Sequence, residues 1–187
     1  IRNPVVSGQF YESDPDELTG LFKTALTINM AQEKNYQTKP FFSLNEKITG
    51  ESHTSKIRKV IKKIKSYKAD YIFISAPENV AWLLNIRGHD SPNSPIPNCR
   101  LIVSKKKEIF LFAYKNKVSK IIKEKKLHKF KIIEPNNFEK VIKNLKDKKF
   151  IIDPLTCSIK NENIIKSKFK IILKNDHCYK LKSLKNS

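Results

Sequence analysis

A polar segment that follows an apolar run holds the residues best suited to chemistry in this chain. The apolar run, residues 80–84, includes the only tryptophan, Trp82, and the polar segment contains Asn85, Arg87 and Asp90. An arginine guanidinium can hold a carboxylate through two parallel hydrogen bonds. Loops at the ends of buried elements are where α/β proteins commonly place functional groups. We therefore take these three polar residues as candidates for a substrate cleft.

A structural role for the same loop is the alternative. Arg87 and Asp90 would then brace the loop against each other and against a neighbouring domain, or Asp90 would accept backbone hydrogen bonds. Gly88 permits a backbone turn that is closed to other residues. Both roles remain open at this point.

Other catalytic arrangements are missing from the sequence. A two-metal hydrolytic site needs several carboxylates that converge from separate strands to activate a bridging water, but the 18 acidic residues are scattered. The four histidines, His53, His89, His128 and His177, lie in unrelated parts of the sequence. The four glycines lack the spacing of a nucleotide-binding loop. We expect no catalytic residue and no metal site in this chain.

The net charge of +20 is a compositional signal with two interpretations. A strongly basic surface is typical of proteins that bind nucleic acid or an anionic membrane. The basic residues are nearly all lysines, however, and arginine stands only at positions 2, 58, 87 and 100. Arginine is the residue best suited to phosphates and base edges. We interpret the lysines as solvated surface residues, with a basic binding module that lacks enzymatic activity as the alternative.

The cysteines and the chain termini bear on the compartment. Cys99, Cys157 and Cys178 lie far apart without CxxC spacing, which favours unpaired thiols in a reducing compartment. No stretch approaches the ~18 apolar residues of a transmembrane helix, and the amino terminus lacks a signal-peptide pattern. The chain begins with Ile1, as a processed or excised fragment would. We expect a cytoplasmic location and no membrane partner.

Apolar periodicity predicts alternating helices and strands from residue 52 onward. Apolar residues at helical spacing from Ile57 to Tyr67 predict a helix, and we assign the lysines between them, including Lys56, to its solvated face. Strands are expected at 71–75, 101–103, 109–113, 130–133, 150–152 and 169–173, and further helices around 118–122, 138–145 and 156–165. Residues 80–86 fit either a strand or a short helical turn. This order predicts an α/β fold with a mixed β-sheet flanked by helices.

The run from Ala81 to Asp90 resembles the "AWLLNLRGxD" signature of the non-catalytic domain of Xaa-Pro aminopeptidases, the aminopeptidase P group of the creatinase/prolidase type. The ten positions differ by one Leu-to-Ile change, at Ile86, and His89 occupies the variable site. Residues 39–42, 49–52, 150–154 and 176–186 resemble the flanking parts of that domain. The resemblance covers residues 37–187 and implies a creatinase/prolidase N-terminal-like domain.

The resemblance also implies a function. The parent would be a cytoplasmic, proline-specific metallopeptidase whose two manganese ions lie in a separate "pita-bread" catalytic domain beyond residue 187. This chain would shape the substrate cleft for short Xaa-Pro peptides and support a homodimer, but would be inactive alone. We then expect Trp82 to be buried and residues 87–90 to lie exposed at one edge of the sheet.

The first 29 residues resemble a different family. The stretch from Asn3 to Leu18 is similar to "PAVAGQFYPxDPxEL", with which members of the Memo-like family begin. We therefore expect a Memo-like segment and linker at residues 1–36, followed by the domain at 37–187.

Overall fold

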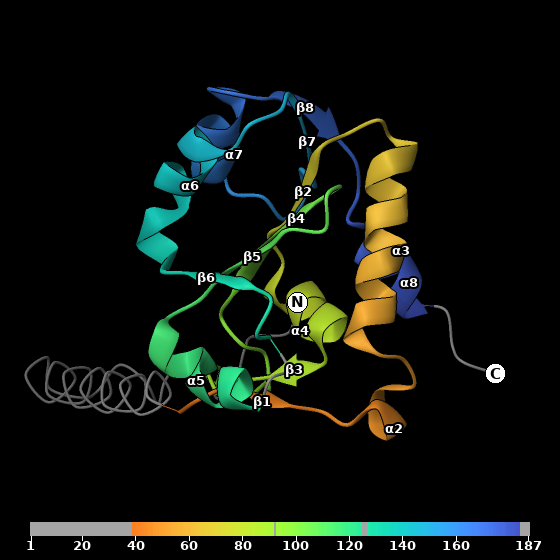
Figure 1. Cartoon of the computed structure of the whole chain (residues 1–187), viewed down its shortest axis with the longest axis vertical. Helices are drawn as coiled ribbons and strands as arrows, with labels where there is room; N and C mark the ends of the chain where they lie inside the picture. The colour runs from red at the N-terminus through yellow and green to blue at the C-terminus, as the bar shows by residue number, and fades with distance from the viewer. Residues whose placement is uncertain (1–38, 92, 125–126, 184–187) are drawn as a thin grey trace, which may run out of the picture.

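The computed structural model describes residues 39–91, 93–124 and 127–183. The fold is built on a six-stranded mixed β-sheet (Figure 1). Its strands are β2 (Tyr71–Ile74), β4 (Arg100–Ser104), β5 (Ile109–Phe112), β6 (Lys131–Ile133), β7 (Lys149–Ile152) and β8 (Lys170–Leu173). They lie in the order β6-β5-β4-β2-β7-β8. β2 pairs antiparallel with β4 and parallel with β7, and β4 forms the predicted hairpin with β5. The parallel pairs β5–β6 and β7–β8 complete the mixed sheet that the sequence predicts.

The predicted Memo-like segment and linker, residues 1–36, lie outside the described residues. The division of the chain into two parts therefore stays a prediction.

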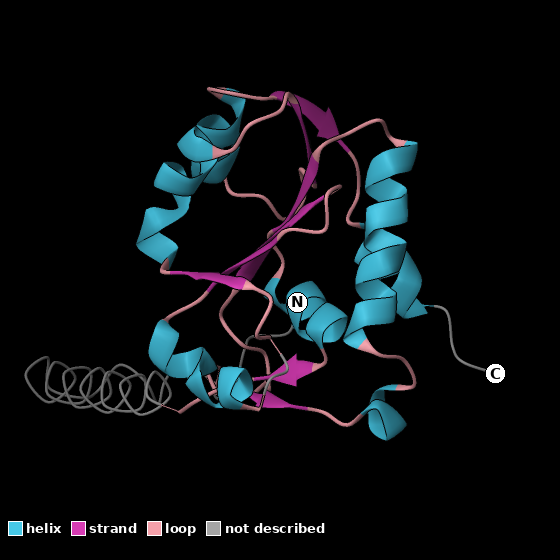
Figure 2. Ribbon diagram, in the orientation of Figure 1, coloured by secondary structure: helices cyan, strands magenta, loops and turns pink. Residues whose placement is uncertain are grey.

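Helices cover both faces of the sheet (Figure 2). One face carries α3 (His53–Ser66), α4 (Pro77–Leu84), α5 (Lys115–Lys123) and α8 (His177–Ser183), and the other carries the 3-10 helix η1 (Pro135–Asn137), α6 (Phe138–Asn144) and α7 (Ile159–Lys166). Because successive strand residues point to opposite faces, Ile72 and Ile74 join the first apolar core while Tyr71 and Phe73 join the second. The expected α/β layers are confirmed.

Helix α3 follows its predicted pattern with one exception. The side chain of Ser52 caps it by accepting a hydrogen bond from the Ser55 backbone N–H. Its buried apolar residues are Ile57, Val60, Ile61 and Ile64. Lys56, which we assigned to the solvated face, is instead only 2% exposed. That assignment was wrong because Lys56 finds polar partners beneath the helix.

The segment that could have been strand or helix forms α4, with Pro77 in its first turn, where a proline costs no hydrogen bond. The helix ends at Asn85, whose left-handed backbone has φ 55° and ψ 39°. The chain then enters the short strand β3 (Ile86–Arg87), which pairs antiparallel with β1 (Phe42–Ser43). The loop therefore runs through a separate two-stranded sheet rather than the main sheet. Of residues 87–90, which we expected to be exposed, His89 is exposed, whereas Arg87 and Asp90 are half-buried and Gly88 is buried. Helix α2 (Glu46–Thr49) follows β1.

Candidate functional site: the Asn85–Asp90 loop

The structure keeps the three candidate residues in one loop but gives each a different partner. Asn85 is buried, whereas Arg87 and Asp90 are half-buried. The contacts of these side chains show which parts of the loop are bound to the rest of the domain and which face outward.

Asn85 is held by Lys56, a residue that sequence reasoning missed. The Nζ of Lys56 donates to the Asn85 Oδ1 at 2.6 Å and to the Trp82 carbonyl oxygen at 2.9 Å. The Asn85 Nδ2 donates in turn to the Glu51 carbonyl oxygen at 2.8 Å. Burial lowers the pKa of Lys56 to about 8, because a charged amine loses hydration inside a protein. The network fixes the point at which α4 becomes the loop.

Trp82 is partly buried and packs against the first apolar core, so the expectation of a buried tryptophan is met only in part. Its ring lies beneath the Lys56 Nζ, 4.3 Å from the ring centroid. A cation over an indole face is stabilised by the negative charge of the π-system. The tryptophan thus helps to accommodate the buried lysine.

Arg87 binds backbone rather than a carboxylate. Its Nη1 donates to the Ile86 carbonyl oxygen at 2.8 Å and to the Ala81 carbonyl oxygen at 3.4 Å. Ala81 lies in the last turn of α4, where the helix dipole gives the helix end a partial negative charge. Arg87 and Lys56 thus both place cations at this helix end. Arg87 does not pair with Asp90, so the predicted mutual brace was wrong.

Asp90 pairs with Lys117 of α5 instead. The two side chains form an ion pair, and Lys117 is only 3% exposed. The second carboxylate oxygen of Asp90 accepts a hydrogen bond from the Asn98 backbone N–H at 2.6 Å, as one alternative predicted. Both oxygens of Asp90 therefore tie the loop to other parts of the domain.

Gly88 is required for close packing rather than for an unusual turn. A Cβ at this position would lie 2.7 Å from the Pro97 Cα and 2.9 Å from the Pro97 Cβ. The described glycine with a positive φ is Gly50, not Gly88, so the predicted turn was wrong. The Gly88 backbone N–H donates to the Pro95 carbonyl oxygen at 3.1 Å. The proline-rich segment thus lies directly against the loop.

The outward side of the loop is His89. Its exposed ring contacts Phe42 of β1, with the ring centroids 5.3 Å apart. Both rings line a cavity of about 460 Å³ together with Lys39, Pro40 and Lys120. This surface combines apolar rings with positive charge, which suits contact with another molecule or domain better than bond-breaking chemistry.

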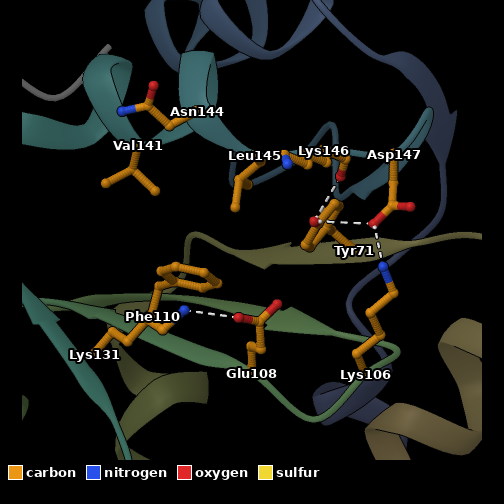
Figure 3. A pocket seen from close by; sticks show the side chains of 10 residues that line it. All are labelled: Tyr71, Lys106, Glu108, Phe110, Lys131, Val141, Asn144, Leu145, Lys146 and Asp147. Atoms are coloured by element: carbon orange, nitrogen blue, oxygen red, sulfur yellow. Dashed lines mark hydrogen bonds and ion pairs between the residues drawn. The ribbon is translucent and has the colours of Figure 1, made fainter.

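A second cavity, of about 370 Å³, lies beside Tyr71, the first residue of β2 (Figure 3). The Tyr71 hydroxyl donates to the Lys146 carbonyl oxygen at 2.7 Å and to Asp147 at 3.2 Å. Four of the charged side chains that line the cavity form the ion pairs Lys106–Asp147 and Lys131–Glu108. Burial raises the pKa of Tyr71, so its hydroxyl stays protonated. The polar groups stabilise one another, and the cavity gives no sign of a reactive group.

The described residues contain no group of three or more His, Cys, Asp or Glu side chains placed to hold a metal ion. Within them, no helix has the length and apolar character needed to cross a membrane. The three cysteines are free, with Cys99 and Cys178 buried and Cys157 half-buried. Burial raises the pKa of all three thiols, which makes them poor nucleophiles.

Comparison with known protein families identifies the family of this chain. The family described as "Creatinase/Prolidase N-terminal domain" matches residues 32–187. The chain belongs to this family, which confirms the resemblance seen over residues 37–187. It is also similar to Xaa-Pro aminopeptidase 1 of Dictyostelium discoideum, with 31% identity over 84 residues. That match covers 45% of this chain and 13% of the relative, so the chain corresponds to a small part of the relative's length.

Solved structures share the fold. The X-prolyl aminopeptidase of Caenorhabditis elegans, described as a cytosolic enzyme with a di-nuclear active site, matches with a TM-score of 0.71 and 23% identity. The match covers 79% of this chain and 25% of that enzyme. The N-terminal domain of a Lactobacillus brevis Xaa-Pro dipeptidase matches with a TM-score of 0.51 and 15% identity, over 69% of this chain and 99% of that domain.

Proposed function

We propose that this chain is the non-catalytic domain of a proline-specific metalloaminopeptidase and that its Asn85–Asp90 loop shapes the substrate cleft. The observation that supports the proposal most directly is the way the loop is held. Asn85, Arg87 and Asp90 anchor it to α3, α4 and α5, and His89 is left on the outer surface. A rigid loop with an exposed tip is suited to limiting the room available to a ligand on a neighbouring domain.

The catalytic chemistry would come from elsewhere in the parent protein. In this proposal the pita-bread domain lies beyond residue 187 and holds two manganese ions, which activate water for cleavage of short Xaa-Pro peptides. A homodimer and a cytoplasmic location belong to the same proposal. The di-nuclear site and the cytosolic location described for the nematode enzyme support it.

A chimeric enzyme tests this function. Residues 37–187 would replace the amino-terminal domain of the Dictyostelium relative, and hydrolysis of an Xaa-Pro peptide would be measured with manganese. We expect the chimera to be active and the 187-residue chain alone to be inactive. The exposed His89→Ala change in the chimera should alter KM for longer peptides more than kcat, whereas His128→Ala, outside the loop, should alter neither.

Two results would contradict the proposal. Peptide hydrolysis by the chain alone would show that it contains the catalytic residues. A chimera whose KM is unchanged by His89→Ala would contradict the role of the loop in the substrate cleft.

The alternative of a basic binding module rests on the net charge of the chain. The structure gives particular lysines structural roles: Lys56 and Lys117 are buried, and Lys105 pairs with Asp70. Steeply salt-dependent binding to nucleic acid would revive that alternative.

A further inference from the structure

A groove between α3 and the segment that leads into β6 is not used by the function proposed above. Its volume is about 540 Å³, within the range of pockets that hold one small molecule. Ile57 and Ile61 of α3 and Ile109 of β5 form an apolar floor, and the ring of Phe130 closes one side. The groove shares no residue with the Asn85–Asp90 loop.

The rim of this groove has one sign of charge. Arg58, Lys107 and Lys129 are exposed and line it together with His53, Thr54 and His128, and none of the described residues that line the groove is acidic. Cations around a low-dielectric floor concentrate the positive potential in the groove. The apolar floor favours a hydrocarbon or aromatic body, while the rim favours a negative head group.

We propose that this groove binds a small carboxylate with an apolar tail. The tail lies on Ile57, Ile61 and Ile109, and the carboxylate contacts Arg58, Lys107 or Lys129 at the rim. The size of the groove favours a single small molecule over an extended peptide, and its charge excludes a cationic amphiphile. A ligand of this kind would be held on the side of α3 that faces β5.

Octanoate is a suitable probe, with octanol as its neutral counterpart. Binding to the 187-residue chain would be followed by NMR of labelled isoleucine methyl groups. We expect saturable shifts at Ile57, Ile61 and Ile109, and about tenfold weaker binding of octanol. The triple variant Arg58→Gln/Lys107→Gln/Lys129→Gln should bind octanoate about tenfold more weakly than the unmodified chain.

A matched variant separates the groove from general surface charge. Lys62→Gln/Lys65→Gln/Lys140→Gln removes the same number of charges from exposed positions outside the groove. We expect it to bind octanoate as the unmodified chain does. Equal weakening in both triple variants, equal binding of octanol and octanoate, or unshifted methyl groups would each overturn the proposal. Because all six positions are exposed, both variants should keep the fold, which circular dichroism would verify.

Discussion

The Nζ of Lys56 in α3 lies 2.6 Å from the Oδ1 of Asn85, the residue at which α4 ends. The two residues are 29 positions apart and both are buried. The side-chain amide of Asn85 thus accepts a hydrogen bond from a buried cation and donates one to the Glu51 carbonyl oxygen. The backbone of the same residue has a left-handed conformation. Asparagine tolerates that backbone better than most residues, which explains why it suits the position.

Asn85→Ala should therefore be strongly destabilising. The variant deprives buried Lys56 of an acceptor and places alanine in a left-handed conformation, so we expect a loss of about 2–4 kcal/mol in the free energy of unfolding. Urea unfolding followed by Trp82 fluorescence measures this. Asn163→Ala, at an exposed position in α7, is the matched control and should change stability by no more than about 0.5 kcal/mol. Equal effects of the two changes would contradict the role given to Asn85.

Lys56 should also make stability depend on pH. Its pKa is about 8 in the folded protein against an ordinary value of 10.5. Between these values the unfolded chain binds more protons than the folded chain, so this residue makes stability rise with pH across that window. The free energy of unfolding of the unmodified chain, minus that of Lys56→Met, should therefore increase from about pH 8 to about pH 10.5. Parallel curves for the two proteins would show that Lys56 is not the cause.

Gly88→Ala tests the close approach of the proline-rich segment. The added Cβ would meet the Pro97 backbone at 2.7 Å, so part of the loop must shift, at a cost of about 1–3 kcal/mol. Urea unfolding measures the loss, and NMR shifts of residues 95–98 should report the displacement. Since Gly88 is not at positive φ, a stable variant with an unmoved loop would show that the contact with Pro97 is unimportant.

Asp90→Asn isolates the ion pair between the loop and α5. The change leaves the buried Lys117 without its carboxylate partner, and we expect a loss of about 3 kcal/mol. Glu162→Gln removes the carboxylate from the Lys166–Glu162 pair within α7, which should cost no more than about 0.5 kcal/mol. Denaturant unfolding of both variants gives the comparison. A loss for Asp90→Asn as small as for the control would mean that the Asp90–Lys117 pair does not hold the loop.

The sequence predicts the main sheet well because β2, β4, β5 and β7 are apolar enough to be recognised alone. It cannot predict α2, which buries no residue, or α8, which buries only Cys178, because such helices have no apolar periodicity to detect. The loop was identified from its polar residues, but its partners were not. Lys56 and Lys117 look like all other lysines in a lysine-rich chain, and only the fold shows that they are buried.

The pairing of β2 with β7 has a consequence for the order of folding. Tyr71 lies opposite Phe150, so the strand that precedes the α4 helix finds its parallel neighbour only late in the chain. Contacts between residues so far apart in sequence form slowly because a long loop must first be closed. During synthesis, β2 and β4 can pair early, whereas β7 and β8 can join the sheet only after the last third of the domain has been made. A chain shortened before β7 would thus retain the signature sequence without the sheet that supports it.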